Sequence, residues 1–236
     1  MSGFREQKTQ ILAVLKDPDW EQGLLRLVDK IPAQKLIPPL LSFLPHTSEI
    51  KWRAITGMGL VVPHMEKQDK AKALSVMRRL LCAMQRNSSN SGWGVAEAMG
   101  EVMAMSEPMA RRFHKQLISY IQNPKVSISG NNYIEHPQLR QGAYWGLARL
   151  SQVRPEFTAH VGPELLRALP KEGTPSQGLI CWILGSIKAE QAKDALLELA
   201  DSKSEIELYR DKRLTEVTLG ALAQEAVMGL DLDPDE

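Results

Sequence analysis

The stretch that decides the fold is WRAITGMG at residues 52–59, which returns as WGVAEAMG at residues 93–100. Both copies begin with Trp and end with Met followed by Gly. The same frame, ending in an apolar residue followed by Gly or Ala, fits residues 141–148, 178–185 and 213–220. The copies follow one another at roughly 35 to 50 residues, which is the length that a pair of helices needs.

Each copy is predicted to lie on the second helix of a helix pair. In one pair, leucines at helical spacing from Leu36 to Leu44 predict the first helix. The second helix is expected from Glu49 to Val62, with Pro63 ending it, because proline cannot donate the backbone hydrogen bond of a helix interior.

The other pairs are predicted in the same way along the chain. The first pair covers residues 4–15 and 20–31, further first helices cover residues 73–84, 113–121 and 192–200, and the last copy places a second helix over residues 213–220. The sequence therefore predicts an all-α fold, a right-handed α-solenoid of about six helix pairs. We expect one domain over residues 1–230, with residues 231–236 forming a disordered acidic tail.

The segment from Ile37 to Leu44, followed by Trp52-Arg53-Ala54 and Met58-Gly59, resembles the HEAT-like repeats, in particular the bacterial PBS-lyase HEAT-like repeat family. The resemblance implies that the second helices line a concave surface, which such repeat proteins mostly present to partners. One difference is notable. The family usually has Arg near the start of the second helix, and here only the copy at residues 213–220 has it.

Composition restricts the classes of function. Lys and Arg number 29 against 28 Asp and Glu, so the net charge of +1 does not indicate a nucleic-acid-binding protein. No window approaches the 18 apolar residues of a membrane span, and residues 1–10 lack a signal peptide. The two cysteines, Cys82 and Cys181, are predicted to be buried reduced thiols. These features predict a cytoplasmic protein, which we expect to be monomeric.

The five tryptophans are all predicted to lie on second helices. Measured from the last small residue of each copy, four of them occupy two positions one helical turn apart, and the other residues at these positions are mostly polar or small. We therefore expect this face to be open to solvent, as a groove with aromatic anchors for a protein partner. The alternative is that the indoles fill gaps between helix pairs. The groove is predicted to contain Trp52, Arg53, Trp93, Glu97, Arg140, Trp145 and Trp182.

The longest interruption of the repeat lies at residues 123–137, which mix turn formers with β-branched residues. Tyr133 and His136 in this segment are candidate binding residues, if the segment forms an ordered lid over the groove. A solvated connection is the alternative. A polar stretch at residues 87–92 is expected to cap the helix that follows.

The sequence contains none of the common catalytic motifs. No HExxH, GxGxxG, GxxxxGK[ST] or GxSxG motif occurs, and the five histidines have no zinc-type spacing, so no cofactor or metal is predicted. The sequence thus favours a non-enzymatic scaffold or adaptor that binds a protein. Two alternatives stay open, a HEAT-like alkylpurine DNA glycosylase using Trp93, Glu97 and Trp182, and a protein that holds a planar ligand such as a tetrapyrrole.

Overall fold

The computed structural model describes residues 2–47, 49–85, 92–122 and 132–231. Contacts between residues divide the chain into two compact units, residues 1–109 and residues 110–236, and the boundary falls inside one helix. That the chain forms a single domain over residues 1–230 stays a prediction.

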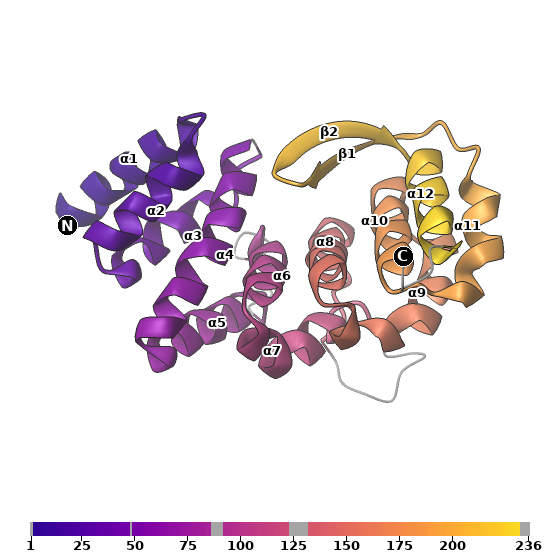
Figure 1. Ribbon diagram of the computed structural model, residues 1–236, viewed down its shortest axis with the longest axis horizontal. Helices are drawn as coiled ribbons and strands as arrows, with labels where there is room; N and C mark the ends of the chain where they lie inside the picture. The colour runs from indigo at the N-terminus through magenta and orange to yellow at the C-terminus, as the bar shows by residue number, and fades with distance from the viewer. Residues whose placement is uncertain (1, 48, 86–91, 123–131, 232–236) are drawn as a thin grey trace. The chain divides into compact units, whose positions relative to one another are not determined.

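Unit 1 consists of successive helix pairs (Figure 1). The first helices and second helices alternate along the chain, and each second helix packs against the next, α2 against α4 and α4 against α6. The bounds are α1 Ser2–Lys16, α2 Trp20–Lys30, α3 Ile37–Phe43, α4 Glu49–Gln68, α5 Lys70–Gln85 and α6 Val95–Met105, with a short 3-10 helix at Ala33–Lys35.

Unit 2 repeats this arrangement and adds a β-hairpin. Here α8 packs against α10 and α10 against α12. The bounds are α7 Glu107–Ser119, which begins in unit 1, α8 Pro137–Val153, α9 Gly162–Ala168, α10 Thr174–Ser186, α11 Lys193–Leu199 and α12 Leu219–Asp231; strands β1 Glu205–Arg210 and β2 Arg213–Thr218; and 3-10 helices at Pro155–Phe157, Ala159–Val161, Leu169–Lys171 and Glu190–Ala192. The predicted all-α helical-repeat fold is confirmed, apart from the hairpin.

The glycine that ends the repeated motif lets neighbouring second helices approach closely. A Cβ atom on Gly59 of α4 would lie 2.6 Å from Cγ of Glu101 on α6. In unit 2, a Cβ atom on Gly185 of α10 would lie 2.8 Å from the Cα atom of Ala226 on α12. Both distances are shorter than any ordinary contact between carbon atoms, so a larger side chain would separate the helices. The recurring glycine is therefore explained by packing.

Pro63 does not end the second helix of its pair, as the sequence predicted. Helix α4 continues to Gln68 with Pro63 inside it. The residues that follow the proline make tertiary contacts, since Met65 is buried and the Ser106 hydroxyl donates to the Glu66 carboxylate at 2.5 Å. These contacts compensate the backbone hydrogen bond that the proline removes, which is worth roughly 1 kcal/mol.

The prediction of a helix over residues 213–220 is wrong. Residues 213–218 form strand β2, which pairs in antiparallel register with β1, and α12 begins only at Leu219. The connecting residues Asp211 and Lys212 both have positive φ, of 50° and 64°, as a two-residue hairpin turn requires. Figure 1 shows the hairpin extending from the start of α12 past α10 toward α8. The segment is a strand because it pairs with β1, in which exposed and buried residues alternate from Glu205 to Leu208.

The predicted cap, lid and tail fall on residues 87–91, 123–131 and 232–236, which lie outside the described residues. Cys181 is buried and free, as expected, but Cys82 is exposed on α5, so its predicted burial is wrong.

None of the helices in the described ranges is both long and apolar enough to cross a membrane.

Candidate partner-binding site

The helix pair α4 and α6 carries an ion pair beside a tryptophan. Glu97, in the first turn of α6, is buried, and its Oε1 atom lies 2.9 Å from Nζ of Lys51 on α4. The same ammonium group lies 4.6 Å from the ring centroid of Trp52, in a cation–π contact. Lys51 thus joins two of the predicted groove residues, Trp52 and Glu97. Trp52 itself is half-buried.

Trp93 lies in a turn before α6 and not on a helix, so its predicted helical position is wrong. The next residue, Gly94, has a φ of 72°, and a Cβ atom there would lie 2.7 Å from the carbonyl oxygen of Leu44. Only glycine satisfies both conditions without strain. The turn keeps Trp93 half-buried, four residues before Glu97.

Arg53 is engaged inside unit 1. Its Nη1 atom donates to the carbonyl oxygens of Leu15 at 2.8 Å and of Asp17 at 3.1 Å, and Nη2 pairs with the Glu49 carboxylate. Leu15 belongs to the last turn of α1, where carbonyl groups have no partner within the helix. Arg53 on α4 therefore caps the C-terminal end of α1, and its guanidinium group forms its contacts within unit 1.

Arg140 in unit 2 forms a buried clamp. Its guanidinium group donates to both carboxylate oxygens of Glu172, at 2.6 and 3.0 Å, and to the carbonyl oxygens of Ile134 and Glu135. Burial alone would lower the pKa of the Arg140 guanidinium group, but the hydrogen bond and the charge of Glu172, together with Tyr133 and Tyr144, outweigh burial and raise this pKa. The Tyr133 ring lies 5.2 Å from this group.

These contacts fix the segment that enters α8. Tyr144 completes the cluster, because its hydroxyl lies 3.2 Å from Oε1 of Glu172, and its burial followed by the charge of Glu172 raises the pKa of the phenol. Among the predicted site residues, Arg140 and Tyr133 are therefore brought together. His136 precedes the first turn of α8 and is exposed.

The indoles of Trp145 and Trp182 lie below the hairpin. Trp145 on α8 donates from Nε1 to the carbonyl oxygen of Tyr209 at 2.7 Å, and its ring is 6.2 Å from the Tyr209 ring. The guanidinium group of Arg210 lies 5.6 Å from the ring of Trp182 on α10. Both indoles are buried, with exposed fractions of 3% and 6%. The expectation that this helix face is open to solvent is wrong here, because the hairpin covers it.

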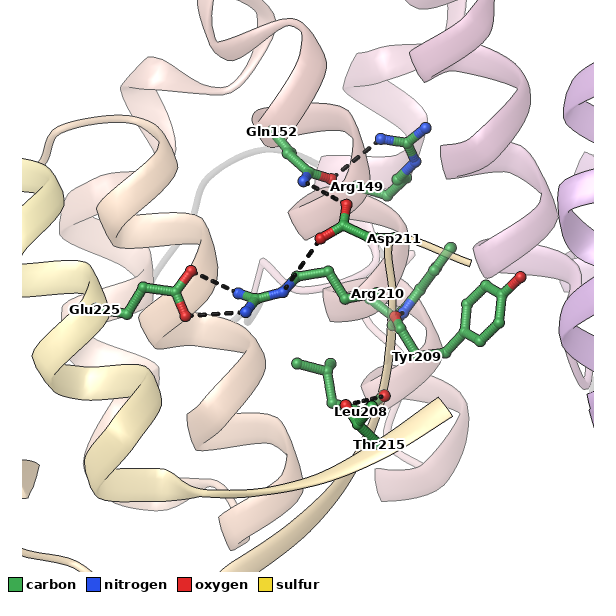
Figure 2. Close-up of polar contacts among 9 residues, drawn as sticks. Arg149, Gln152, Leu208, Tyr209, Arg210, Asp211, Thr215 and Glu225 are labelled. Atoms are coloured by element: carbon green, nitrogen blue, oxygen red, sulfur yellow. Dashed lines mark hydrogen bonds and ion pairs between the residues drawn. The ribbon is translucent and has the colours of Figure 1, made fainter. Parts of the chain in front are cut away.

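Polar contacts hold the hairpin to the helices beneath it, as Figure 2 shows. Arg210 donates to both carboxylate oxygens of Glu225 on α12, at 2.7 and 3.0 Å. In the turn, Asp211 accepts a hydrogen bond of 3.3 Å from Gln152 on α8, which in turn accepts one from Arg149. The hairpin is thus attached at α8 and α12, the outer two of the three second helices of unit 2.

Sequence reasoning missed the partners of the residues that it singled out. Lys51, Glu172 and Tyr209 were not considered, because each lies far along the chain from the residue that it binds. The hairpin itself had a usable signal. From Glu205 to Leu208 charged and apolar residues alternate, which is the pattern of a half-buried strand.

No group of three or more His, Cys, Asp or Glu side chains among the described residues is placed to hold a metal ion. An open cavity of about 360 Å³ lies at the end of α7, and it is lined by Lys115, Ser119, Gln122 and His160, among others. None of the predicted binding residues lines this cavity.

Comparisons with known proteins support the fold and no more specific identity. No family model and no curated protein matches the sequence. A crystal structure of an engineered protein from the Northeast Structural Genomics Consortium superposes with a TM-score of 0.54 at 12% identity, covering 95% of this chain and 96% of that chain. Computationally designed armadillo repeat proteins for modular peptide recognition give a TM-score of 0.48 at 14% identity, covering 94% of this chain and 99% of that chain. The chain thus has the fold of the first of these proteins. Membership of the PBS-lyase repeat family is not shown.

Proposed function

We propose that the protein is a non-enzymatic scaffold that binds a protein partner on the second helices of unit 1. The observation that carries this proposal is the half-buried Trp52 indole on α4, held beside the Lys51–Glu97 ion pair. Tryptophan is enriched among the residues that dominate binding energy, and it acts best in a partly enclosed setting beside polar groups. We include Trp93 in the site because it precedes α6, the helix of Glu97, and is also half-buried.

The chemistry of this site favours an apolar side chain of the partner. Lys51 compensates the buried carboxylate of Glu97, so the site presents an indole surface with a neutralised polar pair beside it. An aliphatic or aromatic side chain would pack on the indole, and the ammonium group of Lys51, whose side chain is 18% exposed, would donate hydrogen bonds to polar groups of the partner at the rim. Cytoplasmic location and a monomeric state belong to the same proposal.

No specific contact supports the alternative of a DNA glycosylase or that of a protein that holds a planar ligand. The carboxylate that base excision would require, Glu97, is paired with Lys51. Trp182 is covered by Arg210 within its own unit.

The test is affinity capture by the full chain from a cell lysate, followed by measured binding of the captured protein. Wild-type protein is compared with Trp52→Ala and with Phe4→Ala, a matched control that truncates an exposed apolar side chain on α1, a first helix of the same unit. We expect a partner that binds the wild type and Phe4→Ala equally and binds Trp52→Ala at least about tenfold more weakly. Circular dichroism establishes that all three are folded.

Two outcomes contradict the proposal. Equal binding of the partner by Trp52→Ala and the wild type would exclude this site. Recovery of nucleic acid or of a ligand that absorbs above about 350 nm in place of a protein would exclude the function.

A further inference from the structure

The hydrogen-bond pattern of the hairpin determines which backbone groups point out of the sheet. The N–H of Leu219 donates to the carbonyl oxygen of Ser204 at 2.9 Å, one step beyond the pair Glu205 and Thr218. Bonded and non-bonded pairs alternate in an antiparallel ladder, so the pair of Glu205 and Thr218 is non-bonded. The bonded pairs are therefore Ile206 with Val217 and every second pair from there to the turn. The backbone groups of the residues between them therefore point outward.

The two outer edges of this sheet differ. On β1, the outward carbonyl oxygen of Tyr209 accepts the indole N–H of Trp145, which agrees with the alternation derived above. On β2, the outward groups belong to Leu214 and Glu216, and neither has a hydrogen bond beyond the hairpin among the residues that the structure describes. Glu216 is exposed and Leu214 is half-buried. An exposed strand edge of this kind is a template for a further strand.

The face of the hairpin next to this edge is acidic. Glu207 on β1 lies directly opposite Glu216 on β2, in a non-bonded pair, where side chains come closest. Glu205 lies two residues away on the same face, and all three side chains are exposed. In the described part of the chain, none of the three has an ion-pair partner. Like charges directly opposite one another destabilise a sheet, so a cation bound here would relieve repulsion.

The hairpin is also held in place before any partner arrives. The double hydrogen bond from Arg210 to Glu225 and the hydrogen bond from Gln152 to Asp211 attach it to two helices. A strand that is already ordered costs less conformational entropy on binding than one that must fold.

We propose that the outer edge of β2 binds an extended, cationic segment of a partner protein, which adds a third strand to the hairpin. Backbone hydrogen bonds to Leu214 and Glu216 supply the pairing, and a Lys or Arg side chain opposite Glu216 supplies the charge complementarity. The inference uses none of the residues of the site proposed on unit 1, so either can fail without the other.

The first experiment tests the charge. The probe is a capped peptide of about ten residues that alternates Lys and Val, titrated into the isotopically labelled full chain while the amide resonances of Leu214 and Glu216 are followed. We expect saturable shifts confined to the hairpin, with affinity about tenfold lower in Glu216→Lys. Glu216→Lys replaces the repulsion from Glu207 by attraction, so the hairpin stays folded. Glu198→Lys on α11 is the matched control, an exposed glutamate with the same change of charge.

The second experiment tests the backbone pairing and leaves the protein unchanged. Two further peptides carry N-methyl groups, one on every Lys and the other on every Val. In an antiparallel addition, the residues whose N–H groups face β2 are those beside Glu216, so methylation of Lys abolishes binding and methylation of Val preserves it. If only the peptide methylated on Val failed to bind, the result would support parallel addition to the same edge.

Two results would overturn the proposal. Equal binding of both methylated peptides would show that no strand forms. An equal loss of affinity in Glu198→Lys and Glu216→Lys would show that the peptide is attracted only by the net charge of the protein.

Discussion

In unit 1 the Trp52 indole is half-buried under Lys51, whereas in unit 2 the Trp145 and Trp182 indoles are buried below the β1–β2 hairpin. All three residues lie on second helices of the same repeat. The difference arises between α11 and α12, where the chain forms a hairpin before the last second helix begins. In unit 2 the hairpin covers the face of the second helices that stays partly accessible in unit 1.

The arginines of the two units show the same contrast. Arg53 lies at the edge of α4, where it caps a neighbouring helix through two carbonyl groups and keeps 19% of its side chain exposed. Arg140 has both oxygens of a buried carboxylate and two carbonyl groups as acceptors, and only 10% of its side chain is exposed. Both arginines therefore pack within their own unit, and the partners that surround each of them decide how far its side chain is buried.

The largest expected effect concerns the two cysteines, one in each unit. Burial raises the pKa of the Cys181 thiol on α10 to about 12, whereas Cys82 on α5 is exposed. Because the raised pKa keeps Cys181 protonated below that value, its reactive thiolate is scarce at pH 8. We expect Cys181 to react with a thiol reagent at least about a hundredfold more slowly than Cys82 in the folded protein.

The measurement is a time course of thiol modification at pH 8. The Cys82→Ser variant isolates the slow reaction, and denaturant should make both cysteines of the wild type react at similar rates. Equal rates for the two thiols in the folded protein would mean that the interior of unit 2 opens readily, and the contrast between the units would fail.

The next effect separates the tryptophans. Trp145→Ala removes a buried side chain and its hydrogen bond to Tyr209, so we expect a loss of about 3 to 5 kcal/mol in the free energy of unfolding. Trp52→Ala removes a half-buried side chain and should cost less than about 2 kcal/mol. Urea unfolding followed by circular dichroism measures both. If Trp52→Ala lost more unfolding free energy than Trp145→Ala, the indole that stabilises the fold would be the one in unit 1.

A comparable but smaller difference is expected between the arginines. Arg140→Ala leaves the Glu172 carboxylate buried without its cation, and breaking such a pair costs about 3 to 5 kcal/mol, with the lower end expected because Tyr144 still contacts Glu172. Arg53→Ala should cost about 1 kcal/mol, since the hydrogen bonds that it removes are a part-buried one to Leu15 and an exposed one to Asp17.

The double variant Arg140→Met with Glu172→Leu supplies the control for this experiment. It removes both charges together, so it should be more stable than Arg140→Ala alone. A double variant as unstable as the single one would show that packing, and not the unpaired charge, determines the loss.

The helix pairs could be predicted from sequence because their causes are local. The leucines from Leu36 to Leu44 repeat at helical spacing, and Gly59 and Gly185 recur where second helices meet. The predicted helix over residues 213–220 failed because the repeat frame was extended over a segment that pairs with the strand before it. In that strand, β1, Ile206 and Leu208 are buried and Glu205 and Glu207 exposed, so the signal of a strand lay in β1 and not in residues 213–220.

The candidate site was predicted only as a set of residue types. Glu97 is a buried carboxylate because Lys51 reaches it from another helix, and nothing in the spacing of the two residues indicates this contact. Arg140 was chosen as a flanking charge of a groove, yet its partner Glu172 places it in the interior. Tertiary contacts of this kind depend on how helices pack, which a repeat pattern does not specify residue by residue.

The smallest expected effect concerns the hairpin turn on which the contrast between the units depends. Lys212 has a φ of 64°, a conformation that costs a side-chain-bearing residue about 1 kcal/mol relative to glycine. Lys212→Gly also gives the Asp-Gly sequence that two-residue turns of this type favour. We therefore expect the free energy of unfolding to rise by up to about 1 kcal/mol, measured by urea unfolding. Asp211→Gly is the control, because it relieves the neighbouring positive φ but removes the contacts with Gln152 and Arg210, so it should give no gain. A loss of stability in Lys212→Gly would show that the lysine side chain contributes more to holding the hairpin than its backbone conformation costs.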